Sequence, residues 1–231
     1  MGWCYHKPMN EITILKPDWD EIDTALIDMD GTLLDLHFDS YFWLEYVPIH
    51  YAQNNNISTD EAKHILLPMM RSHEGTMKWY CLDFWSQELD LDIAGLKHDL
   101  QHKIAIHDGT EDFLKRLRGN VENIMLVTNA HFDSLNLKLE VTGIDSYFDD
   151  VVSSHRYGFP KEEQQFWRKL QQDYGFKNSS SVMIDDSLAV LKSACKYGIA
   201  YQIAIRKPDT QMPEMKKPGF FSVASLGDIR F

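Results

Sequence analysis

Residues 24–32 read Thr-Ala-Leu-Ile-Asp-Met-Asp-Gly-Thr, and this stretch decides the fold of the chain. Its first four residues form a short apolar run that predicts a buried strand, and Asp28 follows at once. Alternate residues of an extended chain point the same way, so Asp28 and Asp30 share one face. Paired carboxylates suit acid–base chemistry or a metal ion. The same residues also fit a strand followed by a turn, with Gly31 in the turn and Thr32 as a helix cap.

Short strand-like runs recur along the chain, and helix-like segments separate them. This alternation predicts an α/β fold with a Rossmann-like parallel sheet. We expect strands at residues 24–27, 124–127, 150–153, 182–184 and 201–205. Apolar stripes that end at a glycine predict the core faces of three helices. These stripes are Leu135 and Leu139, then Phe166, Leu170 and Tyr174, then Leu188, Leu191 and Cys195.

The stretch between the first two expected strands breaks this alternation. Residues 37–107 read as helical and aromatic, with expected helices at 38–51, 59–70, 76–89 and 94–104. An all-helical insert of this kind resembles a small second lobe, which we interpret as a cap. The expected domains are therefore a core of residues 1–36 and 108–231 and a helical cap domain of residues 37–107.

Composition excludes several classes of partner. The 231-residue chain can bury a full core, and its formal charge of −12 opposes broad contact with nucleic acid or an anionic membrane. No run is long enough to cross a bilayer, and the N-terminus lacks the apolar segment of a signal peptide. Cys4, Cys81 and Cys195 are an odd number without metal-ligand spacing. We therefore expect reduced thiols in a cytoplasmic protein.

Further polar residues stand where other expected strands end. Thr128 and Asn129 follow the second run, and Asp185 and Asp186 follow the fourth. In an open parallel sheet the ligand crevice lies outside the carboxyl ends of the strands, so these side chains should meet. Each also has an ordinary structural explanation, such as a turn or a helix cap.

Lys161 stands at an expected helix start, after Gly158-Phe159-Pro160. A lysine is unfavourable there for the helix dipole, which hints at a role elsewhere, although a lone lysine is most often a solvated surface residue. In this order and spacing, Asp28-x-Asp30-x-Thr32, Thr128, Lys161 and Asp185-Asp186 resemble the four motifs of the haloacid-dehalogenase superfamily. The resemblance covers about residues 23–205, and no motif position is substituted.

This resemblance implies a Mg²⁺-dependent phosphatase and a role for each motif residue. Asp28 would attack phosphorus, form an aspartyl-phosphate and bind the metal, and Asp30 would be the general acid and base. Thr128, Asn129 and Lys161 would contact the phosphorylated substrate. The implied metal ligands are Asp28, the backbone carbonyl of Asp30, and Asp186, with Asp185 acting through water or as a hydrogen-bond acceptor.

Four strings resemble one subgroup of the family, the bacterial GMP/IMP nucleotidases. They are residues 26–36 (Leu-Ile-Asp-Met-Asp-Gly-Thr-Leu-Leu-Asp-Leu), 79–85 (Trp-Tyr-Cys-Leu-Asp-Phe-Trp), 128–131 (Thr-Asn-Ala-His) and 158–162 (Gly-Phe-Pro-Lys-Glu). The resemblance implies a purine 5'-nucleotide as substrate, on which Trp79, Phe84 or Trp85 could stack, although core packing is the commoner role of such residues.

Two alternatives stay open. One is a phosphatase of another small metabolite, such as a sugar phosphate or phosphoglycolate, and the other is a binding module that has lost catalysis. The sequence leaves open whether the protein is a monomer or a homodimer.

Overall fold

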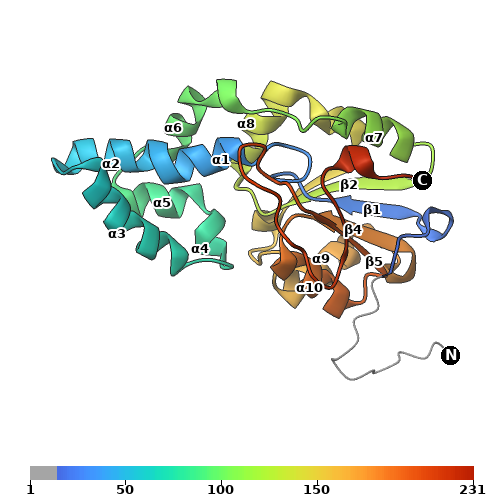
Figure 1. Cartoon of the computed structure of the whole chain (residues 1–231). Coiled ribbons are helices and arrows are strands. Elements are labelled where there is room, and N and C mark those ends of the chain that lie inside the picture. The colour runs from blue at the N-terminus through green and yellow to red at the C-terminus, as the bar shows by residue number, and fades with distance from the viewer. Residues whose placement is uncertain (1–14) are drawn as a thin grey trace.

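The computed structural model describes residues 15–231, so the expected free thiol of Cys4 lies outside the described residues (Figure 1). Its centre is a six-stranded sheet in the order β3-β2-β1-β4-β5-β6, in which every neighbouring pair is parallel. The strands are β1 (Thr24–Ile27), β2 (Asn123–Thr128), β3 (Asp150–Ser153), β4 (Ser181–Asp185), β5 (Tyr201–Ile205) and β6 (Phe221–Val223). The predicted Rossmann-like α/β class is confirmed.

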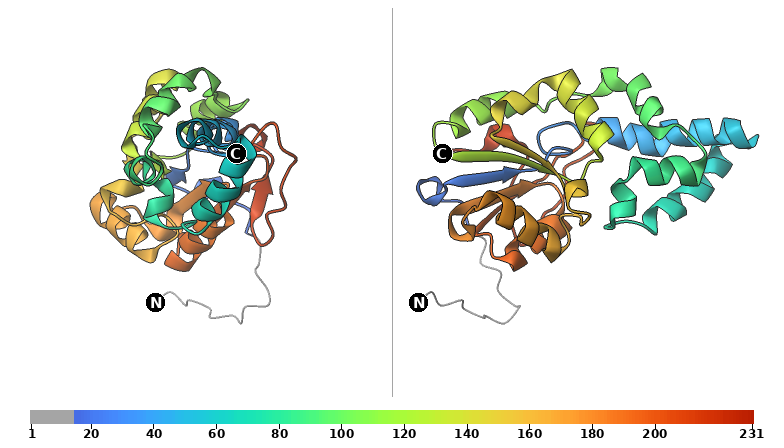
Figure 2. Two further views of the ribbon diagram at one scale, coloured as in Figure 1. Left: turned by 90° about the vertical axis from the view of Figure 1, so that its left-hand side faces the viewer. Right: turned by 180° about the vertical axis from the view of Figure 1, so that it is seen from behind.

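Helices cover both faces of the sheet, as Figures 1 and 2 show. On one face lie α7 (Thr110–Leu117) and α8 (Phe132–Thr142), and on the other α9 (Gln164–Tyr174) and α10 (Leu188–Tyr197). The strand period of two sorts the side chains of β1 between these layers, because Ala25 and Ile27 join the first cluster and Leu26 the second. A sheet buried on both faces is why the strands read as continuous apolar runs.

The five predicted strands are all present, and the structure adds β6 at the edge of the sheet. This three-residue strand is too short to show a period in the sequence. One predicted core position was wrong: Cys195 is exposed, because the buried face of α10 is formed by Val190, Leu191 and Ala194.

The segment between β1 and β2 forms helices that pack around an apolar cluster of their own. In Figure 1 they lie to the left, beyond the carboxyl ends of the strands. Their bounds are α1 (His37–Tyr41), a π-helical turn η2 (Phe42–Tyr46), α2 (Val47–Asn55), α3 (Thr59–Arg71), α4 (Met77–Tyr80), α5 (Leu82–Leu89), α6 (Ile93–Asp99) and the 3₁₀ turn η3 (Gln101–Lys103). This cluster supports the proposed cap of residues 37–107.

The predicted helix over residues 76–89 is wrong in one respect, because it is two helices. Cys81 has an extended backbone (φ −88°, ψ 110°) that ends α4 and begins α5. Its Sγ accepts a hydrogen bond from the Phe84 N–H at 3.4 Å, in the manner of a helix N-cap. Cysteine is not a usual capping residue, so the apolar pattern gave no sign of the break.

Short 3₁₀ turns complete the structure at η1 (Trp19–Glu21), η4 (Ile144–Tyr147), η5 (Ser154–Arg156), η6 (Asn178–Ser180) and η7 (Leu226–Asp228). Across residues 15–231, the helices are too short or too polar to span a bilayer.

Candidate active site

The predicted site residues meet at the carboxyl edge of the sheet. Asp28 follows β1 directly, Thr128 is the last residue of β2, and Asp185 is the last residue of β4. Because β2, β1 and β4 are adjacent and parallel, their ends lie side by side. Lys161 reaches the same point from the loop before α9, two residues ahead of the N-cap Glu163 rather than at the helix start itself.

Lys161 lies at the centre of this group and is 1% exposed. Its Nζ donates to Asp28 Oδ1 at 2.5 Å, to Asp185 Oδ2 at 2.8 Å and to the Val127 carbonyl at 3.0 Å, so each of its three N–H bonds has an acceptor. Burial acts to lower the pKa of Lys161, but the Asp185 and Asp28 carboxylates outweigh it and raise the pKa above its usual value. The lysine therefore carries a fixed positive charge beside Asp28.

Asp28, Asp185 and Asp186 form a cluster whose carboxylate oxygens lie within 4.8 Å of one another. Burial raises the pKa of Asp28 to about 7 in spite of Lys161, and burial together with Asp28 raises the pKa of Asp186 to about 7. Asp28 Oδ2 is buried and has no hydrogen-bond partner among the described residues. Three crowded carboxylates with an unpartnered oxygen fit a hard divalent cation such as Mg²⁺.

The two aspartates at the end of β4, Asp185 and Asp186, differ in the contacts of their side chains. Both oxygens of Asp185 are engaged, since Oδ2 accepts from Lys161 and Oδ1 accepts from the Ser187 N–H at 2.7 Å. The backbone carbonyl of Asp186, rather than its side chain, accepts from Lys217 Nζ. The carboxylate of Asp186 is therefore the freer of the two to bind a metal, which favours it as the direct ligand.

Gly31 brings the backbone close to this cluster. Its φ of +82° belongs to the left-handed region, and a Cβ there would meet Pro208 Cβ at 2.8 Å and Asp186 Oδ2 at 3.1 Å. Two separate reasons therefore favour glycine at position 31: the positive φ, and the lack of space for a Cβ.

Asp30 lies at one end of a buried network of ion pairs that connects the core with the proposed cap. Lys138 of α8 is 1% exposed, and its Nζ donates to Asp30 Oδ1 and to Asp39 Oδ2, both at 2.6 Å. Lys97 of α6 donates to Asp39 Oδ1 at 2.6 Å. Burial raises the pKa of Asp30, Lys138 acts against this rise, and Asp39 adds to it.

Thr128 and Asn129, at the end of β2, form hydrogen bonds with their neighbours in the site. Thr128 Oγ1 accepts from the Ala130 N–H at 3.0 Å, which leaves its own O–H able to donate. Asn129 Oδ1 accepts from the Lys161 N–H at 2.9 Å, and its amide donates to Glu162 Oε2 at 3.0 Å. Asn129 thus positions the Lys161 loop, and its expected substrate contact stays a prediction.

A cavity of about 500 Å³ opens from Asp28 towards the cap. Of the predicted stacking aromatics, Trp79 and Trp85 line it, whereas Phe84 does not. Trp85 is 1% exposed and its indole N–H donates to the Trp79 carbonyl, so it packs as core on one side. The cap wall also includes Trp43, Leu67, Met70, Arg71, Glu74 and Tyr80.

Sequence reasoning missed Lys138, Asp39, Lys97 and Lys217. Each is a charged residue in a helix or loop without a motif, and its partner lies far away in the sequence, as the 108-residue separation of Lys138 and Asp30 illustrates. A lysine within the apolar stripe of α8 was the available signal, because Lys138 follows Leu135 and Leu137 on a face that is buried.

A parallel sheet with an Asp-x-Asp-Gly-Thr turn after β1, an acidic pair after β4 and a helical insert above them is the architecture of one class of hydrolase. The model of the haloacid dehalogenase-like hydrolases matches residues 22–196, and the chain belongs to this family.

Among its relatives, the GMP/IMP nucleotidase YrfG of Escherichia coli (strain K12) is 38% identical over 212 residues, which cover 92% of this chain and 94% of that protein. Among solved structures, a HAD phosphatase from Thermococcus onnurineus superposes with a TM-score of 0.75 at 24% identity, covering 89% of this chain and 94% of the other. The HAD-hydrolase YfnB of Bacillus subtilis, bound to magnesium, superposes with a TM-score of 0.65 at 20% identity, covering 89% and 95%. At these identities the two structures show the shared fold alone.

Proposed function

We propose that the protein is a Mg²⁺-dependent phosphomonoester hydrolase that acts on purine 5'-nucleotides through an aspartyl-phosphate at Asp28. The observation that carries this proposal is the state of the Asp28 carboxylate. One oxygen is held by Lys161 at 2.5 Å, and the other is buried without a hydrogen-bond partner among residues 15–231, beside two further carboxylates and a cavity.

Mg²⁺ would neutralise charge on both the phosphate dianion and the attacking carboxylate when bound. Asp28, the backbone carbonyl of Asp30 and the Asp186 carboxylate would hold it, and Asp185 would orient the site through Lys161 and Ser187. The oxygen-only ligand set suits this ion. Burial first, and neighbouring carboxylates second, raise the pKa of Asp28 and Asp186, and a bound cation would offset both effects.

In the proposed first step, Asp28 attacks phosphorus in line, and the bond from phosphorus to the nucleoside oxygen breaks. Asp30 protonates the departing oxygen. Burial raises the pKa of Asp30, which favours the protonated form that can donate. In the second step Asp30 takes a proton from the water that hydrolyses the phosphoenzyme. Lys161 would exchange one of its present acceptors for a phosphate oxygen, and the Thr128 hydroxyl would donate to another, which places positive charge and a donor where charge develops.

The proposed substrate class rests on the cavity and on the similarity to the GMP/IMP nucleotidase. A cavity of about 500 Å³ with indole side chains at Trp43 and Trp79 suits a flat aromatic base. Arg71 and Glu74 line the same wall and offer a donor and an acceptor for the polar edge of a purine. The proposed cap of residues 37–107 would exclude water while the phosphoenzyme forms.

A panel of phosphate esters tests the substrate class. Phosphate release should be fastest from GMP and IMP, compared with pyrimidine nucleotides, sugar phosphates and phosphoglycolate at equal concentration. Sugar phosphates that turn over about tenfold faster than any nucleotide would remove the nucleotide part of the proposal and leave the phosphatase part standing.

The cap contribution can be measured separately. Trp79→Ala should raise KM for GMP with a smaller change for a minimal aryl phosphate, since base stacking is worth about 1–3 kcal/mol. Phe84→Ala is the matched control, because Phe84 lies on α5, the helix that follows the α4 helix of Trp79, but does not line the cavity.

A further inference from the structure

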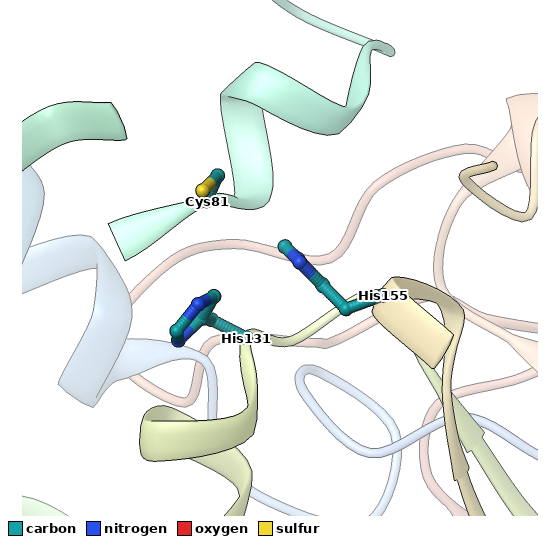
Figure 3. A group of neighbouring side chains, drawn as sticks. All are labelled: Cys81, His131 and His155. Carbon is teal, nitrogen blue, oxygen red and sulfur yellow. The ribbon is translucent and has the colours of Figure 1, made fainter. Parts of the chain in front are cut away.

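A second group of metal-binding side chains lies at the seam between cap and core. Cys81 comes from the break between α4 and α5, His131 from the residue before α8, and His155 from η5 after β3. One ligand atom from each lies within 4.8 Å of the other two. Figure 3 shows Cys81 next to His131 and His155. The two imidazole rings are 4.9 Å apart between centroids.

His155 has a nitrogen that nothing in the described chain uses. Its Nε2 is buried and has no hydrogen-bond partner among residues 15–231. Burial, with His131 close by, lowers the pKa of His155 to about 4, so the ring is neutral at pH 7 and keeps one nitrogen lone pair. The nearby backbone of Tyr80 and of Asn129 acts on the pKa of His155 in the opposite direction.

His131 has the surroundings of a metal-binding histidine. Its Nδ1 lies 3.5 Å from Asp133 Oδ2, and its Nε2 lies 3.7 Å from Asp83 Oδ2. Nδ1 also accepts the Asp133 N–H at 3.4 Å. A metal bound at Nδ1 would replace this long hydrogen bond and leave Nε2–H to donate towards Asp83, which is the usual support for an imidazole ligand. Cys81 Sγ accepts a hydrogen bond from the Phe84 N–H at 3.4 Å, which fixes the sulfur at the start of α5.

We propose that Cys81, His131 and His155 bind one thiophilic divalent cation of the Zn²⁺ type and thereby join the cap to the core. A thiolate and two imidazoles suit such an ion, whereas the all-oxygen cluster around Asp28 suits Mg²⁺. In a tetrahedral site with Zn–S and Zn–N bonds of about 2.3 and 2.0 Å, the ligand atoms lie about 3.5 Å from one another. The present ligand atoms lie within 4.8 Å of one another, so side-chain rotations that move each atom by about 1 Å would form the site. The fourth position is open to water.

The site has a consequence for catalysis, and this consequence rests on the proposed function. Cap and core already touch here, because Tyr80 donates to Glu162 Oε1 at 2.7 Å and Ser154 Oγ contacts Met77 Sδ at 3.9 Å. A metal that links Cys81 to the two core histidines would hold the cap closed over the cavity. Turnover would slow because product must leave past the cap.

Co²⁺ titration tests the site without reference to activity. The reduced full-length protein is kept in excess Mg²⁺, which occupies the carboxylate cluster, and absorbance is followed for the thiolate-to-cobalt charge-transfer band. We expect one equivalent of Co²⁺ to produce the band. Cys81→Ser should abolish it and His155→Ala should weaken binding by more than about tenfold. Serine can still cap α5, so the fold should survive Cys81→Ser.

The double variant Cys4→Ser, Cys195→Ser is the matched control and should keep the band. Cobalt binding without a charge-transfer band in the wild type, or a band that persists in Cys81→Ser, overturns the proposal. In phosphate-release assays, half-inhibition of Cys81→Ser should need more than about tenfold more Zn²⁺ than the wild type. Equal inhibition of the two proteins overturns the link to cap closure, and absence of any phosphatase activity overturns the proposed function while the cobalt result stands on its own.

Discussion

At the scale of single residues, the site depends on charges placed where water cannot screen them. Lys161 and Lys138 are each 1% exposed, and each contacts two carboxylates. Lys161 joins Asp28 to Asp185, and Lys138 joins Asp30 to Asp39. The two lysines thus set the electrostatic surroundings of the proposed nucleophile and of the proposed acid–base residue separately.

Removing the Lys138 charge should be costly. Lys138→Met keeps the length of the side chain but leaves Asp30 and Asp39 without their shared partner, so we expect a loss of about 3 kcal/mol in the free energy of unfolding. Urea denaturation measures it. Lys169→Met is the control, because Lys169 is exposed on α9 and should change stability by less than about 0.5 kcal/mol. Equal losses in the two variants would contradict the role given to Lys138.

The proton-transfer role of Asp30 has its own test. Asp30→Asn should lower kcat for GMP by about 10²- to 10⁴-fold, because the amide cannot donate to the leaving oxygen as an acid. The defect should shrink with an aryl phosphate whose leaving group needs little protonation. A defect of the same size for both esters would argue that Asp30 acts through structure instead.

The sequence could predict where side chains at strand ends meet, whereas their roles stay proposals. Asp28, Thr128 and Asp185 each sit at a strand end, and parallel neighbours fix where such ends meet, so the pattern of runs was enough to predict their meeting. Lys138 and Asp39 could not be found in this way. Their contact is made between α8 and α1, and no local pattern encodes which buried lysine faces which carboxylate.

At the scale of elements, the turn after β1 decides how closely the backbone approaches the acidic cluster. Gly31→Ala adds a Cβ at a φ of +82°, against Pro208 and Asp186. We expect a loss of about 1–3 kcal/mol in stability together with weaker Mg²⁺ binding, since Asp186 must move. Thermal denaturation with and without Mg²⁺ measures both effects.

Gly143→Ala is the matched control for this substitution. Its φ is +61°, and a Cβ there meets nothing within 4 Å, so it reports backbone strain alone. The control should lose stability without any change in Mg²⁺ binding. Equal changes in Mg²⁺ binding for the two variants would contradict the crowding argument.

The elements themselves were largely predictable, and the exceptions have physical causes. The buried strands show as apolar runs, whereas β6 is three residues long and has no period to read. The break at Cys81 is made by an extended backbone angle and a sulfur cap, neither of which the apolar pattern of residues 76–89 contains. Cys81, at that break, lies beside His131 and His155, which are distant in the sequence, so cysteine spacing alone could not indicate the proposed metal site.

At the scale of the whole molecule, the core and the proposed cap enclose a cluster of three carboxylates whose pKa values are all raised. Burial raises the pKa of Asp28 and Asp186 to about 7 and that of Asp185 to about 6. Unfolded aspartates titrate near about 4. Between about pH 4 and 7 the unfolded chain therefore releases protons that the metal-free folded protein keeps, and folding stability falls as the pH rises through this window.

Bound Mg²⁺ should remove this penalty. The rise in Tm on adding Mg²⁺ to chelator-treated protein should be small near about pH 5 and grow towards about pH 8, because metal and protons compete for the same carboxylates. Differential scanning calorimetry at fixed ionic strength measures it. Asp186→Asn should flatten the pH dependence of the Mg²⁺ effect. A Tm increase of equal size at both pH values would contradict the assignment of the cluster as a cation site.

The central claim is that Asp28 carries the phosphoryl group, and acid-quench trapping with GMP labelled in its phosphate tests it most directly. Wild-type protein with Mg²⁺ should carry covalent label on the peptide that contains Asp28, and Asp28→Asn should carry none and release no phosphate. Phosphate release that survives Asp28→Asn undiminished, or label on a peptide without Asp28, would contradict the account.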